Sequence, residues 1–563
     1  MIGGVAAGMS FAARARRLSE EVEITILERG SDISFANCGL PFHIGGEIKS
    51  RDVLAQHTPE SFRNLFNLDV RTEHNAVQID RKNKRVLVAN RSSASQEWLS
   101  YDKLMLAPGA RPTVPIIPGV HDPAVFTLRT LGDMDRIIAA SGSGKRVIVV
   151  GGGYIGIELI EQLHKKGLEV TLVQLHTHLL PQFDSHVVLP LQAELDRHGI
   201  KAWYANYLTS IEREGDELHG HLSTGEVLTA DFVIFSIGVR PESELARDAG
   251  LVLAHTGHVV VNEFMQTSDP DIYAAGDVVQ TRKRHFGQPI AISLAGPASR
   301  QARVAADHIF LDHLARPYPG DIGTSIVRFF DMVAAVTGWT EGALIESRRS
   351  YETVTVHENH HSGFYPGAEL LTLKLLWEPE TGMILGAQVT GREGVDKRID
   401  VLATAVIGKM TIDDLCHLEL AYTPPFGIVR DVINIAGFAA TSIRDGLVQV
   451  VYDVPEDPHT QFLDVRPRPL ASKYPLEGAI NIPLSSLRQN LDALDKNRSV
   501  TVVCQLGKTS YFAARVLTQN GFDAVSFAGG VRGFKGGAKG IVPRSAPIQE
   551  SGKEFPGLLP DNL

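Results

Sequence analysis

Two segments of the chain share one order of hydrophobic and polar positions: a glycine-rich turn, an amphipathic helical pattern and then an apolar strand pattern. The first begins at Gly3, where GGVAAG leads into MSFAARARRL, and its strand EVEITIL ends beside Glu28. The second has an apolar strand, KRVIVV, before the turn GGGYIG, and its later strand EVTLVQL ends near Gln174. Strand, turn, helix and strand in this order form a βαβ unit. The pattern therefore predicts two parallel α/β units.

The first turn has the residues that a nucleotide pyrophosphate needs. Gly3 and Gly8 permit a tight turn and close helix packing, and backbone N–H groups at the helix start, near Ala6, face the phosphates. Glu28 lies twenty residues after Gly8 and can accept a hydrogen bond from a ribose hydroxyl. Val5 stands where GxGxxG has its middle glycine, so this turn is the weaker of the two signals.

The second turn has the full GxGxxG spacing, with Gly151, Gly153 and Gly156. Gln174 occupies the position at which an acid favours NADH, and no lysine or arginine occurs between residues 168 and 180 to bind the extra phosphate of NADPH. We therefore expect a pyridine nucleotide here and favour NADH. NADPH stays open as an alternative, because His176 can tolerate a phosphate.

The strand that should precede the first turn is nearly absent. Only Met1 and Ile2 come before Gly3, whereas a buried parallel strand has about five or six residues. Either the start is truncated or the sheet is completed in some other way.

Composition narrows the class of protein. The 563 residues include three cysteines and no apolar stretch long enough to span a bilayer, which excludes a disulfide framework and a membrane protein. The start lacks the regions of a secretory signal, so we expect a cytoplasmic protein. The formal net charge of -10 argues against nucleic acid as a partner. No metal site is predicted.

Cys38 lies in SFANCGLP with no second cysteine near it. Dithiol flavoenzymes carry a CxxxxC pair, but the residue five positions after Cys38 is His43. The oxidised form must then be a mixed disulfide, a persulfide or a sulfenic acid. A buried structural cysteine is the alternative for any isolated thiol.

Several further motifs occur in one order along the chain. They are YDKLMLAPGARP from Tyr101, TSDPDIYAAGDV and LAGPASRQAR. Together with the two turns and the lone thiol, they resemble the flavoprotein disulfide reductase superfamily, in its coenzyme A disulfide reductase, NADH-dependent persulfide reductase and NADH oxidase branch. The resemblance implies FAD, NADH or NADPH, and coenzyme A. It places Asp277 at the ribitol chain and Ala295 at the helix start that faces the flavin, while Ser299 departs from the usual asparagine or histidine.

The same resemblance implies a homodimer with shared sites. Tyr365 in HSGFYPGA and Tyr422 in ELAYTPPF are similar to the tyrosines that reach the thiol from the partner subunit, although two aromatic core residues are the alternative. Arginine suits a pyrophosphate because its planar fork gives bidentate hydrogen bonds. Arg16, on the first helix, is explained equally well by a solvated helix face. The residues expected to line the coenzyme A channel are Ser10, Arg14, Arg17, Ser34, Asn37, Ser299 and, from the other subunit, Arg430.

A second globular pattern begins after residue 455. FLDVR, EGAINIPL, SVTVVCQLGKTSYFAARVL and AGGVRGF resemble a single rhodanese domain. Cys504 ends an apolar strand and opens the loop CQLGKT, whose N–H groups and following helix stabilise a thiolate or persulfide. Lys508 stands where many relatives have arginine. A rhodanese domain without activity is the alternative. Cys416 lies before this domain and is expected to be structural.

We therefore expect an α/β protein with two Rossmann-like domains for FAD and NAD(P), an α+β dimerisation domain and a C-terminal α/β rhodanese domain. The expected boundaries are 1–110 and 241–320 for the FAD domain, 111–240 for the NAD(P)H domain, 321–446 for dimerisation, 447–457 for a linker, 458–545 for the rhodanese domain and 546–563 for a tail.

The expected activity is reduction by NADH or NADPH of persulfides, polysulfides or disulfides of coenzyme A or a similar thiol. Electrons pass through FAD to Cys38, and Cys504 exchanges sulfane sulfur with the coenzyme A thiol. One alternative is an NADH oxidase or peroxidase in which Cys38 cycles as a sulfenic acid. Peroxide chemistry is disfavoured because Ala6 stands where the peroxidase branch has histidine. The other alternative is a sulfur-carrying or redox-sensing module with little turnover.

Overall fold

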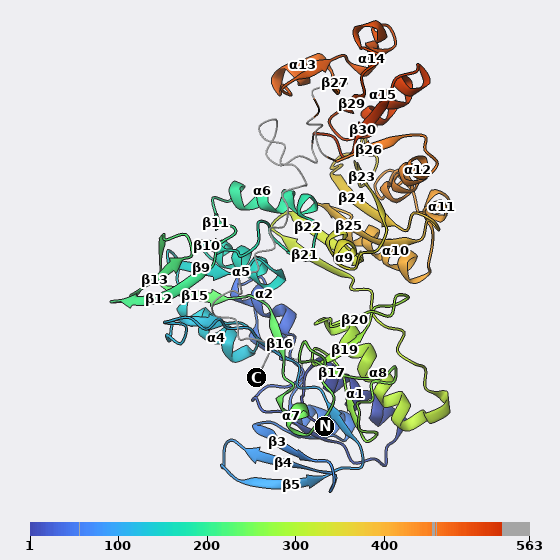
Figure 1. Ribbon diagram of the computed structural model, residues 1–563. Helices are drawn as coiled ribbons and strands as arrows, with labels where there is room; N and C mark the ends of the chain where they lie inside the picture. The colour runs from blue at the N-terminus through green and yellow to red at the C-terminus, as the bar shows by residue number, and fades with distance from the viewer. Residues whose placement is uncertain (56, 453–456, 458, 532–563) are drawn as a thin grey trace. The chain divides into compact units, whose positions relative to one another are not determined.

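The computed structural model describes residues 1–55, 57–452, 457 and 459–531, and it divides into two compact units (Figure 1). The first comprises Met1–Thr177 and Ile200–Asp321. The second comprises His178–Gly199 and the described residues from Ile322 onward. The end of the expected rhodanese domain (532–545), the expected tail and residues 453–456 of the expected linker lie outside the described residues.

The first unit contains a parallel sheet that is completed by one residue. Ile2 forms parallel bridges to Leu27 on one side and to Leu106 on the other. It thus joins two strand pairs. Helices α1 and α8 lie side by side. These elements are β1 (Thr25–Leu27) with β2 (Asp69–Arg71), β6 (Leu104–Leu106) with β18 (Ile272–Ala274), α1 (Ala6–Leu18), α8 (Ala295–Leu311) and α3 (Pro59–Phe66).

The first unit also contains the second βαβ pattern, in a five-stranded parallel sheet of order β11-β10-β9-β15-β8. The run RVIVV forms its central strand because a strand covered on both faces needs apolar side chains throughout. The elements are β8 (Val125–Thr127), β9 (Arg146–Val150), α5 (Tyr154–Lys165), β10 (Glu169–Val173), β11 (Lys201–Trp203) and β15 (Phe232–Phe235), and α4 (Leu131–Ala140) accompanies them. Two antiparallel meanders complete the unit: β3 (His74–Asp80), β4 (Arg85–Asn90) and β5 (Gln96–Ser100), and β12 (Leu208–Glu214), β13 (Glu217–Leu222) and β14 (Val227–Ala230).

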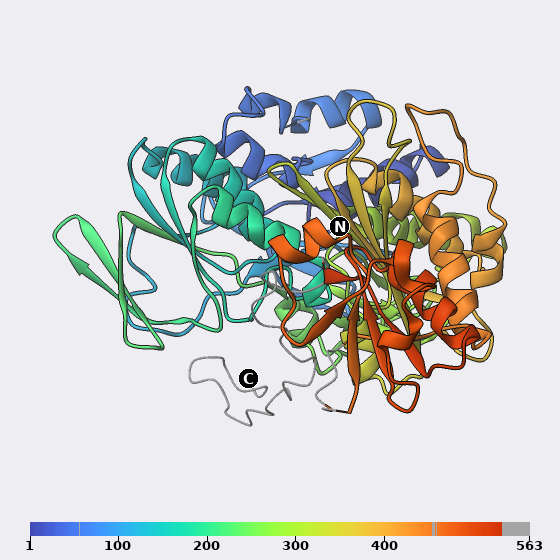
Figure 2. The same cartoon turned by 90° about the horizontal axis from the view of Figure 1, so that it is seen from above.

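The second unit begins with an antiparallel sheet of order β21-β22-β25-β24-β23, in which β23 is an edge strand. Helices α10 and α12 cover one face of this sheet (Figures 1 and 2). Apolar side chains from the sheet and these helices form one core. The elements are β21 (Ser325–Phe329), β22 (Met332–Gly338), α9 (Glu341–Glu346), β23 (Glu352–Asn359), β24 (Leu370–Trp377), β25 (Ile384–Gly391), α10 (Val395–Ile407), α11 (Ile412–Cys416) and α12 (Val432–Arg444).

A parallel sheet of order β26-β30-β29-β27-β28 follows in the same unit. Its first strand, Gln449–Val451, lies within the expected linker and pairs with the last strand, so these three residues form part of the sheet that follows. The elements are β26 (Gln449–Val451), β27 (Gln461–Asp464), α13 (Arg468–Lys473), β28 (Ala479–Asn481), α14 (Leu484–Leu487), β29 (Val500–Val503), α15 (Lys508–Gln519) and β30 (Ala524–Phe527).

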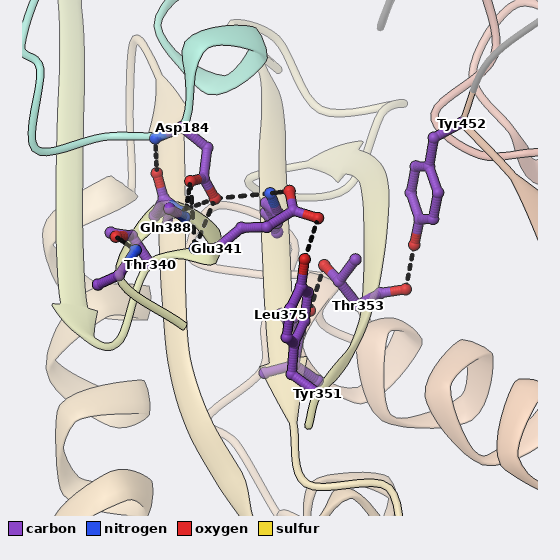
Figure 3. Close-up of polar contacts among 11 residues, drawn as sticks. Asp184, Thr340, Glu341, Tyr351, Thr353, Leu375, Gln388 and Tyr452 are labelled. Carbon is purple, nitrogen blue, oxygen red and sulfur yellow. Dashed lines mark hydrogen bonds and ion pairs between the residues drawn. The ribbon is translucent and has the colours of Figure 1, made fainter. Parts of the chain in front are cut away.

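A buried ion cluster ties the segment His178–Gly199 to the antiparallel sheet (Figure 3). The Nζ atom of Lys374, on β24, is fully buried and lies 2.6 Å from Asp184 and 2.5 Å from Glu341. Burial alone would raise the pKa of Asp184, but the ammonium of Lys374, with smaller contributions from His186 and Gln388, holds that pKa below its usual value. Since breaking such a cluster leaves an unpaired buried charge, it fixes this segment on the sheet. Among the described helices, none is long and apolar enough to cross a membrane.

Candidate active sites

The first glycine turn holds an acid at the end of β1. A Cβ on Gly8 would lie 2.0 Å from the carbonyl oxygen of Gly3, so α1 can approach the turn only with glycine there. The N–H groups of Gly4 and Gly30 donate to the two carboxylate oxygens of Glu28 at 2.9 and 2.8 Å. Ala6 is exposed as the first residue of α1. The turn thus presents a fixed carboxylate and a helix start, which fit a ribose and a phosphate.

The second turn repeats this geometry with an amide in place of the acid. A Cβ on Gly156 would lie 1.9 Å from the carbonyl oxygen of Gly151, whereas a Cβ on Gly153 would meet nothing within 4 Å. The middle glycine therefore borders open space beside the start of α5, where a pyrophosphate fits. Gln174 is buried, and its Oε1 accepts from the N–H of Gly152 at 3.0 Å, as Glu28 accepts from Gly4.

A third loop adds a carboxylate next to the start of α8. The N–H of Gly276 donates to Gln301 on α8 at 2.9 Å, which fixes the neighbouring Asp277. Burial raises the pKa of Asp277, while Arg129, 3.7 Å away, acts in the opposite direction. Ala295 is exposed as the first residue of α8. A carboxylate and a helix start in this arrangement suit the ribitol hydroxyls and the polar edge of a flavin.

Cys38 lies in a short 3-10 turn, Asn37–Gly39, and reaches the surface. The loop before it is held to the first glycine turn, because the N–H of Ser34 donates to the carbonyl oxygen of Gly4 at 2.8 Å. No side chain caps the short helix α2 (Leu40–Ile44) that follows. The Cys38 sulfur lies 3.7 Å from the Oδ1 of Asn37.

The charges around this thiol disfavour the thiolate in the protein chain alone. Partial burial, then the carboxylates of Glu158 and Asp277, raise the pKa of Cys38, and Arg129 lowers it less. Glu158 comes from α5, against which the end of α2 packs so closely that a Cβ on Gly45 would lie 2.1 Å from Gln162. The thiol therefore needs a further group, such as a bound cofactor, to favour its reactive form.

A cavity of about 410 Å³ opens between α1, α3 and α8. Five of the seven residues expected in the coenzyme A channel line it. Asn37 lies outside its lining, beside the thiol, and Arg430 is exposed in the second unit. The full lining is Met9, Ser10, Ala13, Arg14, Arg17, Ser34, His57, Phe62, Phe66, Ser299, Arg300 and Arg303.

Four arginines give this cavity its charge, and one carboxylate orients two of them. Arg14 donates to Asp307 at 2.6 Å, and Arg303 lies 3.7 Å from the same carboxyl group. Arg16 does not line the cavity. It is buried and donates to the carbonyl oxygens of Phe66 and Asn67, so the explanation of Arg16 as part of a solvated helix face is wrong. A cavity with several guanidinium groups fits a phosphorylated ligand.

Seven of the residues that line this cavity were not predicted from the sequence. Arg300 and Arg303 follow Ser299 within the motif LAGPASRQAR, and their spacing along one helix was a signal that could have found them. The aromatic residues of α3 had no such signal, because nothing in their sequence places α3 against α1.

Tyr365 and Tyr422 lie on loops of the second unit, and each is 42% exposed, so the alternative of two aromatic core residues is wrong. The loops are joined where the N–H of Ser362 donates to the carbonyl oxygen of Gly427 at 2.9 Å. Large apolar side chains are exposed around them. These are Phe364, Phe426 and Val429. An exposed apolar group of this kind marks a surface for another chain.

Cys504 is buried directly after β29 and opens the loop CQLGKT, as the sequence predicted. The N–H of Gly507 donates to its sulfur at 3.1 Å, and Ser510 on α15 lies 3.5 Å from it. Gly530 closes the loop from the other side, because a Cβ there would lie within 2.6 Å of the N–H nitrogens of Leu506 and Gly507. The loop can stabilise negative charge on sulfur.

Cys416 donates to the carbonyl oxygen of Ile412 in its own helix, as a structural residue would.

Two nucleotide turns, the carboxylates beside them and a thiol next to both define a flavin-dependent pyridine nucleotide oxidoreductase. Comparison with known families agrees. The pyridine nucleotide-disulphide oxidoreductase domain matches residues 1–304, its dimerisation domain matches residues 324–431, and a rhodanese-like domain matches residues 447–536. The chain therefore belongs to the pyridine nucleotide-disulphide oxidoreductase family and carries a rhodanese domain. The expected fold class is confirmed, and FAD and a pyridine nucleotide are the cofactors of this family.

The chain is similar to coenzyme A disulfide reductase of Staphylococcus epidermidis, with 33% identity over 445 residues that cover 78% of this chain and 99% of that protein. Among solved structures it is similar to reduced Bacillus anthracis CoADR-RHD (40% identity, TM-score 0.91, 94% and 96% covered). It is also similar to a NAD-dependent persulfide reductase from A. fulgidus (34% identity, TM-score 0.89, 94% and 99% covered). The water-forming NADH oxidase from Lactobacillus brevis shares 28% identity over 79% of this chain and 98% of that one, with a TM-score of 0.76.

Proposed function

We propose that this enzyme reduces persulfides, polysulfides or disulfides of coenzyme A with NADH, through Cys38 as its single redox-active thiol. The observation that carries the proposal is the arginine-lined cavity, which shares Ser34 with the loop that bears Cys38. A ligand with a phosphorylated nucleotide end and a sulfur end matches this pairing. The relatives named coenzyme A disulfide reductase and persulfide reductase support it.

The protein groups have distinct tasks in this reaction. Arg14, Arg17 and their neighbours bind the phosphates of coenzyme A and leave its thiol end free to reach Cys38. With coenzyme A disulfide, the Cys38 thiolate attacks one sulfur, the S–S bond breaks, and coenzyme A thiolate leaves with the electron pair. The product is a mixed disulfide on Cys38. Bound FAD and pyridine nucleotide supply the two electrons that return this disulfide to thiolates.

The leaving sulfur needs a proton or a hydrogen bond. We assign this to Tyr365 and Tyr422 of the partner subunit in a homodimer, because both hydroxyl-bearing side chains are exposed within an apolar surface on the dimerisation domain. Arg430, exposed on the same stretch of chain, would complete the phosphate site from that subunit.

Cys504 would exchange sulfane sulfur with the coenzyme A thiol, in either direction. Its thiolate accepts a sulfur atom from a donor, and the persulfide anion lies where the N–H of Gly507 donates. A flexible coenzyme A arm can connect two thiols by raising their effective concentration. A reducing cytoplasm is the proposed location, because the 563 residues include only three cysteines.

NADH is the proposed electron donor. The side chain of Gln174 is buried at the end of β10 and can satisfy a ribose hydroxyl, while the loop after it, through Leu180, has no basic side chain other than histidine for a 2′-phosphate.

Steady-state consumption of NADH tests the proposal against both alternatives. We expect coenzyme A persulfide or coenzyme A disulfide to support turnover well above the rate with oxygen or hydrogen peroxide. Faster turnover with oxygen or peroxide would favour the oxidase or peroxidase. Negligible turnover with every acceptor would favour the sulfur carrier or sensor.

A further inference from the structure

The rhodanese domain covers the edge strand β23 of the antiparallel sheet, within the second unit. Three polar contacts run along this strand. The hydroxyl of Tyr452 donates to the carbonyl oxygen of Thr353, the Nε2 of His357 lies 3.2 Å from the carbonyl oxygen of Gly529, and the Nζ of Lys508 lies 3.2 Å from Glu358. The last two contacts reach residues beside the Cys504 loop, so the dimerisation domain forms part of the surroundings of the rhodanese site.

His357 supports the wall of this loop. It is buried, and because a carbonyl oxygen only accepts hydrogen bonds, its Nε2 must carry the proton that Gly529 receives. Gly529 in turn lies against Gly507, where an added Cβ would be 3.0 Å from the Gly529 nitrogen. The strand β23 thus holds the segment that closes over the N–H groups of the sulfur loop.

Glu358 changes the charge that a sulfur donor meets. Lys508 is the first residue of α15 and the single cation in the loop CQLGKT. Its ammonium pairs with Glu358, whose side chain is 14% exposed while that of Lys508 is 57% exposed. An anion approaching Cys504 therefore meets a cation that a carboxylate has already neutralised. Among the residues of this loop, the N–H groups are then left as the main attraction for negative charge.

We propose that Glu358 determines the donor specificity of the rhodanese site. It selects against free dianionic donors such as thiosulfate and favours hydropersulfides carried on thiols that are uncharged near the sulfur. The pantetheine end of coenzyme A is such a thiol. This inference rests on the proposed sulfur transfer by Cys504 and names its substrate class.

The chemistry is the same for both donors, and only the leaving group differs. With thiosulfate, the Cys504 thiolate attacks the outer sulfur, the S–S bond of thiosulfate breaks, and sulfite leaves with the electron pair. With a hydropersulfide, the Cys504 thiolate attacks the outer sulfur, the S–S bond breaks, and the carrier thiolate leaves with the electron pair and takes up the proton. Both steps give Cys504 persulfide, from which added cyanide removes the sulfur as thiocyanate and restores the thiolate.

The test measures thiocyanate formation by the full-length enzyme with two donors, thiosulfate and the hydropersulfide of N-acetylcysteamine. The carrier thiol of the second donor has no charged group, so this donor brings at most one negative charge against the two of thiosulfate. The measured quantity is the ratio of kcat/KM for thiosulfate to kcat/KM for the hydropersulfide. We expect Glu358→Gln to raise this ratio about fivefold at low ionic strength, and the gain to shrink as salt screens the charges. Glu358→Asp, which keeps the carboxylate, should leave the ratio within about twofold.

Two further variants test whether the ratio depends on the charges of this ion pair. Lys508→Met should lower the ratio, because it removes the cation and leaves the carboxylate. Glu346→Gln, at an exposed glutamate at the end of α9, is the matched control and should not change it.

An unchanged ratio in Glu358→Gln, or an equal loss with both donors, would overturn the specificity role. Cys504→Ser separates this from a failure of the proposed function. If that variant still forms thiocyanate at the parental rate, rhodanese transfer through Cys504 itself is wrong. If it is inactive while the Glu358→Gln ratio is unchanged, sulfur transfer stands and the specificity proposal alone fails.

Discussion

Cys38 and Cys504 face opposite surroundings. Cys38 reaches the surface, and burial and two carboxylates raise its pKa. Cys504 is 1% exposed, and a backbone N–H donates to its sulfur at 3.1 Å. Within the protein chain alone, the first thiol is accessible and its charged form is disfavoured, whereas the second is enclosed and accepts a backbone hydrogen bond.

This contrast separates two kinds of sulfur chemistry. A thiol that holds a transferable persulfide benefits from a closed loop, because N–H groups stabilise the anion and exclude competing thiols. A thiol that must accept a bulky coenzyme A disulfide needs access, and a cofactor can supply the charge stabilisation that its own chain lacks. Under the proposed function, we therefore expect Cys504 to store sulfur and Cys38 to exchange it.

Removing the accessible thiol should have the largest effect. Cys38→Ser should lower NADH-dependent reduction of coenzyme A disulfide by about 10⁴-fold, because no other group can form the mixed disulfide. The measurement is NADH consumption, with flavin absorbance to show that FAD is retained. Cys416→Ser is the matched control. Parental turnover in Cys38→Ser would rule out the thiol mechanism.

Removing the enclosed thiol should affect only donors that load it. Cys504→Ser should reduce thiosulfate-fed turnover by about 10³-fold, since serine cannot hold a transferable persulfide. Reduction of coenzyme A disulfide should stay close to the parental rate, because that substrate reaches Cys38 directly. Equal rates with every donor would exclude transfer in series from Cys504 to Cys38.

The two sites also differ in how far the sequence predicted them. Cys504, Gly507 and Lys508 lie within five residues, so the loop and its N–H donors follow from local sequence. The surroundings of Cys38 come from distant elements, and Glu158 on α5 had no local signal. For the same reason the glycine turns and their strands were predicted well, whereas the packing of α3 onto the cavity and of β23 onto the rhodanese loop was not. Long-range packing leaves little trace in local periodicity.

The tyrosines test whether the accessible thiol is completed by a second subunit. Replacing both Tyr365 and Tyr422 with Phe should slow the chemical step by about 10²-fold, the usual size of lost proton donation. Single-turnover reoxidation of reduced enzyme by coenzyme A disulfide measures this step. Tyr474→Phe, at an exposed tyrosine of the rhodanese domain, is the control. An unaltered rate in the double variant would contradict the assigned role.

Opening the enclosed site should have a moderate effect. Gly530→Ala should lower rhodanese turnover about tenfold, because its Cβ would lie 2.5 Å from the carbonyl oxygen of Cys504 and the backbone φ is +60°. Gly521→Ala is the matched control: its φ is +82°, but no atom lies within 4 Å of the added Cβ. It reports backbone strain without the collision. An equal loss in both variants would mean that strain, and not the shape of the loop, limits transfer.

The smallest expected effect concerns the charge beside Cys38. Glu158→Gln removes the carboxylate that, after burial, contributes most to raising the pKa of this thiol. The pKa should fall, so a larger fraction of Cys38 is thiolate at any pH below it. Alkylation by iodoacetamide, which reacts with the thiolate, should then be about two- to fivefold faster at neutral pH, and its rise with pH should shift to lower pH.

The Glu158→Gln variant and the parent protein are compared after removal of FAD, so that the difference in alkylation rate reports the protein charges. Glu169→Gln, at an exposed glutamate at the start of β10, should alkylate at the parental rate. If Glu158→Gln leaves the profile unchanged, Glu158 does not contribute, and burial together with Asp277 accounts for the raised pKa of Cys38.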